Sequence, residues 1–305
     1  MSETLLLFVN PTSGRRKVVP MLPQIVNTFA EFGYETRVYL STHRGEIGEL
    51  AEKYGGDAAR VVCAGGDGTL NEMVSGMLRG GHSAPIGYIP AGTTNDLART
   101  LGLSTDIPQA ARDIVTGSPR PLDVGKMNGR YFIYTASFGA FTRSSYAAAQ
   151  SLKNSLGHAA YIIEAMRDLS TLKAQRVKVT SGNTEFEGDI LFGSVSNSTS
   201  LGGILKLDPS LVSLSDGKFE MILLERPRDV AGYAPMLECL INQHYDNEYI
   251  HMVTMSRATF TMSPDTDWTL DGEFSPGAGT VEIENLHSAV NLMVRREDAP
   301  ISFGF

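Results

Sequence analysis

The first 116 residues alternate between segments that favour strands and segments that favour helices, and this alternation limits the fold more than any other feature. Continuous apolar runs such as 4–9 and 60–64 are typical of strands that are buried on both faces of a parallel sheet. The expected strands are 4–9, 35–40, 60–64 and 85–90, and helical spacing recurs at 22–29, 47–54, 70–78 and 107–115, with a further helix beginning near residue 96. We therefore expect an α/β domain with a doubly wound parallel sheet, whose ligands bind at the carboxyl ends of the strands.

The character of the sequence changes near Pro121. Asn128-Gly129 between apolar stretches is a strong signal for a two-residue hairpin, and short strand-like segments follow. Helical spacing interrupts them at 157–172 and 229–241. We expect a first domain over 1–125 and a β-rich, sandwich-like second domain over 126–290, with the C-terminal segment 291–305 able to return to the first domain.

Composition narrows the class of protein. The formal net charge of −8 disfavours nucleic-acid binding, and no apolar run is long enough to cross a bilayer. Two isolated cysteines, Cys63 and Cys239, argue against a disulfide framework, and the N-terminus lacks the basic region of a signal peptide. We expect a cytoplasmic protein.

Three loops rich in glycine and hydroxyl residues follow expected strands. They are NPTSG at 10–14, GGDGTLNE at 65–72 and PAGTTND at 90–96. Glycine permits close backbone approach, and the free N–H groups of a following helix attract phosphate. One such loop could be a structural turn, but three at the same sheet edge favour a nucleotide site. The P-loop pattern and the GxGxxG pattern are both missing from the sequence.

Asp67 places a carboxylate inside this expected phosphate site. Because a carboxylate repels phosphate unless a divalent cation lies between them, Asp67 predicts magnesium. Asp96 and Asp123 lie on loops expected near the same edge and could hold the ion through water. The alternative is that Asp67 caps a helix.

The three motifs, in this order and at these separations, resemble the catalytic domain of the soluble bacterial diacylglycerol kinases, a family that includes the sphingosine kinases. GGDGT also occurs in NAD kinases, but Leu70-Asn71-Glu72 after it is characteristic of the lipid kinases. The resemblance implies the fold of the NAD kinase and diacylglycerol kinase group, and an aspartate–water–magnesium network of Asp67, Asp96 and Asp123. The ATP-binding residues that it implies are Asn10, Pro11, Thr12, Ser13, Gly14, Ser41, Thr42, Gly65, Gly66, Asp67, Gly68, Thr69, Asn71, Glu72, Thr93 and Asn95.

Asp271 and Glu273 form a D-G-E element in the second domain. Spacing alone favours a structural Asp-Gly turn, whereas the resemblance implies catalytic acidic residues. Phosphoryl transfer to an alcohol needs a base for the hydroxyl proton. We assign Glu273 as the leading base, with Asp271 orienting it or helping to hold magnesium, and Asp67 as the competing base.

The segment SLSDGKF at 213–219 is similar to a structural magnesium site of the same family. The resemblance implies ligation by the Asp216 carboxylate and by the backbone carbonyls of Ser213 and Lys218. A simple hairpin turn is the alternative. One glycine and one alanine that commonly accompany this family element are missing around it.

A lipid kinase must reach its acceptor at the surface of a bilayer. Between residues 143 and 178 there are six Lys or Arg and two Asp or Glu, a local charge of +4. We expect this region, around 157–172, to dock peripherally on the inner face of the membrane, with ordinary variation of surface charge as the rival explanation. The resemblance is also compatible with a homodimer.

The sequence therefore predicts an ATP- and magnesium-dependent lipid kinase that phosphorylates diacylglycerol to phosphatidic acid. Two alternatives are an NAD kinase and a nucleotide-binding regulator without kinase activity. Other acceptors also carry a hydroxyl, namely sphingoid bases, ceramide, monoacylglycerol and prenols.

Overall fold

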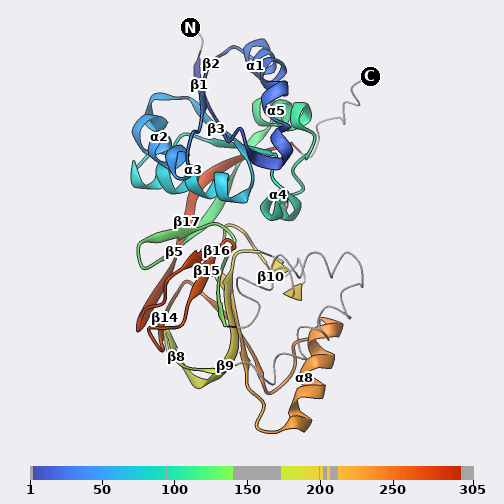
Figure 1. Ribbon diagram of the computed structural model, residues 1–305, viewed down its shortest axis with the longest axis vertical. Helices are drawn as coiled ribbons and strands as arrows, with labels where there is room; N and C mark the ends of the chain where they lie inside the picture. The colour runs from blue at the N-terminus through green and yellow to red at the C-terminus, as the bar shows by residue number, and fades with distance from the viewer. Residues whose placement is uncertain are drawn as a thin grey trace. The chain divides into compact units, whose positions relative to one another are not determined.

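The computed structural model describes residues 3–93, 95–139, 173–198, 200–201, 205–206 and 212–296 of the 305-residue chain (Figure 1). The chain divides into two compact units, which we call the first unit (Met1–Leu122 with Ser288–Phe305) and the second unit (Asp123–His287). The helix expected at 157–172 lies outside the described residues. Among the helices that are described, none combines the length and the apolar character needed to cross a membrane.

The first unit contains a parallel sheet in the strand order β2-β1-β3-β4-β17. Helices α1 and α5 pack together on one face and α2 and α3 on the other (Figure 1), so the expected doubly wound α/β arrangement is confirmed. Its strands are β1 (Glu3–Val9), β2 (Tyr34–Leu40), β3 (Arg60–Gly65), β4 (Ile86–Pro90) and the end of β17 (Thr280–Val294). Its helices are α1 (Leu22–Glu31), α2 (Glu46–Tyr54), α3 (Asp67–Arg79), α4 (Asp96–Leu101) and α5 (Ile107–Thr116), with 3-10 turns η1 (Ser13–Arg16), η2 (Val19–Met21) and η3 (Gly55–Asp57).

Burial on both faces explains the apolar run of the first strand. Leu5, Leu7 and Val9 pack on the side of α1 and α5, while Leu6 and Phe8 are equally buried on the opposite side. The sheet is therefore covered on both faces, and the loops at its carboxyl edge are the parts free to form a site.

The second unit is β-rich and largely antiparallel, as expected. Rings of Phe138 and Phe260 on different strands meet across its core with centroids 6.1 Å apart, as sandwich-like packing predicts. Its strands are β5 (Ser118–Met127, beginning in the first unit), β6 (Arg130–Phe132), β7 (Thr135–Gly139), β8 (Gln175–Ser181), β9 (Thr184–Ser196), β10 (Ser200–Leu201), β11 (Leu205–Lys206), β12 (Phe219–Glu225), β13 (Ile250–Met255), β14 (Arg257–Thr261), β15 (Trp268–Leu270), β16 (Glu273–Ser275) and most of β17. The helix expected at 229–241 is α8 (Val230–Asn242).

Two tight turns match the residues that signalled them. Asn128 and Gly129 have φ of 45° and 86° and join β5 to β6, which confirms the predicted hairpin. Asp271 and Gly272 have φ of 50° and 80° and join β15 to β16 in the same way. The backbone at Asp271-Gly272 therefore forms the structural turn that the spacing alone predicts.

Candidate functional site

The loop after β1 is tied to both of its neighbours. The Asn10 side-chain oxygen accepts hydrogen bonds from the Thr12 backbone N–H (3.1 Å) and hydroxyl (2.9 Å), while the Asn10 amide group donates to the Thr69 hydroxyl (3.3 Å). Gly14 has φ of +52°, and a Cβ there would lie 1.6 Å from the carbonyl oxygen of Ala91. The loop thus contacts the segments after β3 and after β4, and at the second of these contacts only glycine fits.

The loop after β3 enters α3 through Gly65 and Gly66. A Cβ on Gly65 would lie 2.4 Å from the Thr69 hydroxyl, and a Cβ on Gly92 would lie 2.5 Å from the Gly66 Cα. No side chain of the described residues caps α3, so its first-turn N–H groups, at Asp67, Gly68 and Thr69, are suited to an anion.

The loop after β4 is held by Asn95. Its side-chain oxygen accepts from the Gly92 N–H (2.9 Å) and the Tyr88 hydroxyl (3.2 Å), and its amide group donates to the Gly92 carbonyl (3.0 Å). Asn95 itself is buried with φ of +51°, whereas Thr93 is exposed. The three predicted loops therefore meet at one edge of the sheet.

A fourth segment, after β2, is linked to α3. Glu72 on α3 accepts a hydrogen bond from the Gly45 N–H (3.0 Å), and Glu46 accepts one from the Thr42 hydroxyl (2.9 Å). The Ser41 N–H donates to the Val9 carbonyl (2.9 Å), which places Ser41 beside the end of β1. Asn71, one residue before Glu72, accepts from the Ser75 hydroxyl (3.3 Å).

Asp67 is the first residue of α3, and its side chain contacts a second helix, α4. Its carboxylate accepts from the backbone N–H groups of Asp96 (3.0 Å) and Leu97 (3.4 Å) at the start of α4, so it caps α4 rather than its own helix. Burial raises the pKa of Asp67, and the neighbouring charge of Asp96 raises it further.

The carboxylates of Asp67 and Asp96 fit a magnesium ion bound together with phosphate. Magnesium takes oxygen ligands and is commonly held by one or two carboxylates, substrate phosphates and water. Within the part of the chain that the structure describes, no group of three or more His, Cys, Asp or Glu is arranged as a metal site. Binding of magnesium by Asp67 and Asp96 stays a prediction.

Asp271 and Glu273 lie in different surroundings within the second unit. The buried Asp271 carboxylate accepts from three backbone N–H groups, those of Ile133 (2.7 Å), Tyr134 (3.0 Å) and Thr135 (3.0 Å). Glu273, on β16, is half-buried. Asp271 therefore fixes the chain before β7, and the assignment of Glu273 as the base stays a prediction.

Asp123 lies in the second unit beside the Ser213–Lys218 loop. Its fully buried carboxylate accepts from the Gly217 N–H (2.7 Å) and from Asn285 (3.3 Å), and it pairs with His287 (3.2 Å). Grouping of Asp123 with Asp67 and Asp96 stays a prediction, since those two residues belong to the first unit.

The Ser213–Lys218 loop is a turn in which the Lys218 N–H donates to Asp216 (3.0 Å) and Gly217 has φ of +78°. The Lys218 carbonyl accepts from Asn285 (3.1 Å). These contacts show a turn, but the strand that follows it, β12, pairs with β9 and β13 and with no strand described directly before the turn. Metal binding by Ser213, Asp216 and Lys218 stays a prediction.

The sequence analysis missed one buried carboxylate, Glu220 on β12. Its side chain is only 7% exposed, and burial raises its pKa to about 7, with the charge of Asp216 as a smaller cause. A charged residue at an inward position of an apolar strand was a signal that could have found it.

The chain is similar to known proteins in sequence and in fold. The sequence profile of the diacylglycerol kinase catalytic domain matches residues 4–127. The chain is 33% identical to a diacylglycerol kinase of Bacillus subtilis over 295 residues, which cover 96% of this chain and 97% of that protein. It is 31% identical to a diacylglycerol kinase of Staphylococcus saprophyticus, with 90% of each chain covered. A crystal structure of a diacylglycerol kinase from Bacillus anthracis superposes with a TM-score of 0.73 at 20% identity, covering 97% of this chain and 98% of that one, which shows the shared fold.

Proposed function

The chain belongs to the diacylglycerol kinase family and is a lipid kinase, and we propose that it transfers the γ-phosphate of ATP, with magnesium, to the hydroxyl of diacylglycerol. The observation that carries the proposal is the position of Asp67. Its carboxylate lies where a glycine-rich loop, the uncapped start of α3 and Asp96 come together. A carboxylate there is favourable next to phosphates only if a divalent cation offsets the repulsion.

The loop cluster of the first unit would bind and orient the nucleotide. Backbone N–H groups of the loops after β1, β3 and β4 would hold the phosphates, with Ser41, Thr42 and Glu72 ordering the segment after β2. Magnesium, when bound, would neutralise charge that develops during transfer. Asp67 and Asp96 would hold the ion, directly or through water.

The second unit would supply the proton acceptor and the lipid site. We assign the base to Glu273, because the Asp271 carboxylate is already engaged by three backbone N–H groups. Peripheral docking on anionic lipid would bring the enzyme to its acceptor, and a homodimer is compatible with this role. The region 143–178 that we expect to dock lies mostly outside the described residues.

Transfer of labelled γ-phosphate into detergent micelles tests the proposal. We expect label in phosphatidic acid when ATP, magnesium and diacylglycerol are present, and loss of transfer when magnesium is chelated. Sphingosine, ceramide and NAD run in parallel. Label in another lipid would change the acceptor, label in NAD would identify an NAD kinase, and ATP binding without any transfer would identify a regulator.

A further inference from the structure

A row of polar side chains crosses one face of the sheet in the second unit. The local strand order is β13-β12-β9-β7-β15, with all neighbours antiparallel. Residues directly opposite one another on neighbouring antiparallel strands share a face. Thr254, Glu220, Ser196 and Thr135 are opposite one another in turn, and we call these four residues the polar row.

The next positions along the same face extend the polar surface. Ser194 lies opposite Ser137, which lies opposite Thr269. All three side chains are buried. A buried sheet face normally carries apolar residues, so this concentration of hydroxyl groups next to a carboxylate needs a reason.

The buried hydroxyl groups have hydrogen-bond partners, whereas one oxygen of the Glu220 carboxylate has none among the described residues. Thr135 bonds to Ser194 (3.1 Å), Ser137 bonds to Thr269 (2.9 Å), and Ser196 donates to a backbone carbonyl (2.9 Å). The Glu220 Oε2 atom is buried and, among the described residues, has no hydrogen-bond partner. An unpaired buried carboxylate oxygen is costly, and a donor would relieve that cost.

This face becomes apolar in the direction away from Glu220. Ile222 lies two positions after Glu220 on β12. Leu224 lies two positions after Ile222 and is opposite Phe192 on β9. These side chains pack with Met236 and Leu240 of α8 in one apolar cluster. The face therefore has a polar end and an apolar end, as a lipid has.

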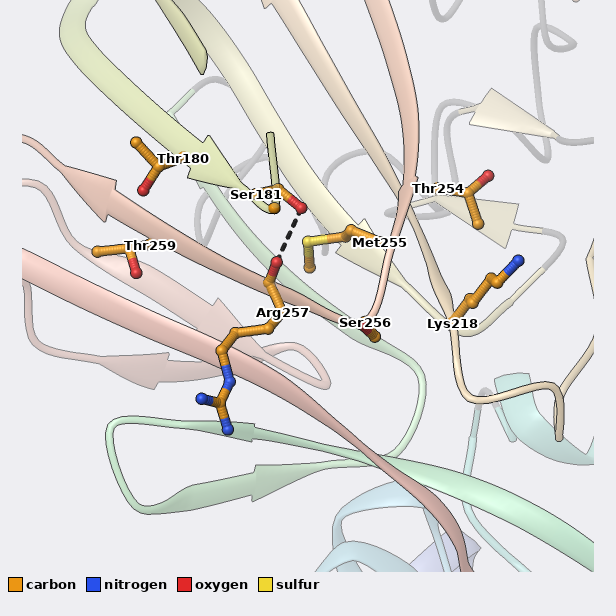
Figure 2. Close-up of a pocket in the computed structure, with 9 residues that line it drawn as sticks. Thr180, Ser181, Lys218, Thr254, Met255, Ser256, Arg257 and Thr259 are labelled. Atoms are coloured by element: carbon orange, nitrogen blue, oxygen red, sulfur yellow. Dashed lines mark hydrogen bonds between the residues drawn. The ribbon is translucent and has the colours of Figure 1, made fainter. Parts of the chain in front are cut away.

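The polar end reaches the edge of the sheet. Thr254, on the edge strand β13, is exposed and also lines an open pocket of about 570 Å³, which Lys218 lines as well (Figure 2). The buried Glu220, on the neighbouring strand β12, lies directly opposite this exposed residue of the edge strand.

We propose that the polar row binds the hydroxyl-bearing head of the acceptor lipid, with Glu220 Oε2 accepting a hydrogen bond from its hydroxyl group and the apolar end of the face next to α8 receiving the chains. The proposal rests on the lipid-kinase function above and adds to it a residue that recognises the acceptor. Glu220 acts as a positioning residue, since proton removal is assigned to Glu273.

The test is competition between two short-chain lipids that differ only at the hydroxyl. A fluorescent diacylglycerol analogue is bound to the full chain in detergent micelles without ATP, and is displaced by dioctanoylglycerol or by its O-methyl ether. In the native protein we expect dioctanoylglycerol to compete about tenfold better or more, since tenfold is close to the lower limit for one hydrogen bond to a charged group. Glu220→Leu should remove this preference and Glu220→Gln should keep part of it, because the amide still offers an oxygen.

Glu225→Gln is the matched control, because Glu225 lies on the same strand but pairs with His251 (2.9 Å) outside the polar row. It should keep the full preference, and thermal unfolding checks that each variant is folded. If folded Glu220→Leu still prefers the free hydroxyl as the native protein does, the inference is wrong. If the native protein neither binds the analogue nor phosphorylates any lipid, the proposed lipid-kinase function is wrong. This outcome differs from failure of the Glu220 inference alone, in which the native protein still binds the analogue.

Discussion

The two units build their candidate sites from different parts of the chain. In the first unit the tightest contacts between loops are made by backbone atoms at glycines, such as Gly14 against the Ala91 carbonyl. In the second unit the corresponding surface is made of side chains that alternate along strands, such as Ser194 and Ser196 on β9. Where backbone atoms of two loops are in contact, a substitution that adds even one carbon atom should be destabilising. Where side chains form the surface, a change of side-chain shape should matter less than the loss of a hydrogen-bonding group.

The largest effect should come from the carboxylate of the first unit. Asp67→Ala should lower turnover by about a thousandfold, because removal of the charge that balances the metal costs transition-state stabilisation. Asp67→Asn keeps oxygen for the α4 N–H groups but loses the charge, so it separates capping from chemistry. Steady-state kinetics and thermal unfolding measure both. Near-normal turnover of folded Asp67→Asn would show that Asp67 is only a cap.

Of the two carboxylates of the D-G-E element, we expect Glu273 to act in catalysis and Asp271 to act in stability. Glu273→Gln should lower kcat by about a hundredfold or more with little change in unfolding free energy, because it removes a base. Asp271→Asn should instead lower the unfolding free energy by about 1–3 kcal/mol, because hydrogen bonds from three N–H groups to a charge are weakened. Chemical denaturation and rapid-quench kinetics separate the two effects, and the reverse pattern would exchange the assignments.

The same contrast explains what sequence could and could not predict. The motifs at Asn10, Gly65 and Asn95 were predictable, because glycines, hydroxyls and caps act through neighbours close in the sequence. The polar row was not, because it depends on the register of strands such as β9 and β12, which no local pattern specifies. The sequence offered a helix cap by Asp67 as an alternative but did not identify α4 as the helix that is capped, since the two N–H partners lie 29 and 30 residues further along the chain.

Glycine substitution gives a smaller effect that tests the backbone explanation of the first unit. Gly14→Ala should lower the unfolding free energy by about 2 kcal/mol or more, because positive φ and overpacking add. Gly33→Ala is the control, since Gly33 also has positive φ (+87°) but a Cβ there would have no atom within 4 Å. It should cost only about 1–2 kcal/mol. Equal losses measured by denaturant unfolding would mean that close approach of the loops is unimportant.

The smallest effect should be a pH-dependent gain in stability at Glu220. Burial raises the pKa of this carboxyl from its ordinary 4.5 to about 7 in the folded chain, with Asp216 adding to the shift, and the residues opposite it, Ser196 and Thr254, are neutral. The folded state therefore favours the protonated form, and the stability linked to it is present below pH 4.5 and lost as the pH rises through 7. Glu220→Gln cannot ionise, so its unfolding free energy should equal that of the native protein near pH 4.5 and exceed it by about 1–3 kcal/mol at pH 8. Denaturant unfolding at the two pH values measures the difference. A variant that is less stable at pH 8 would mean that the native carboxylate has a hydrogen-bond partner.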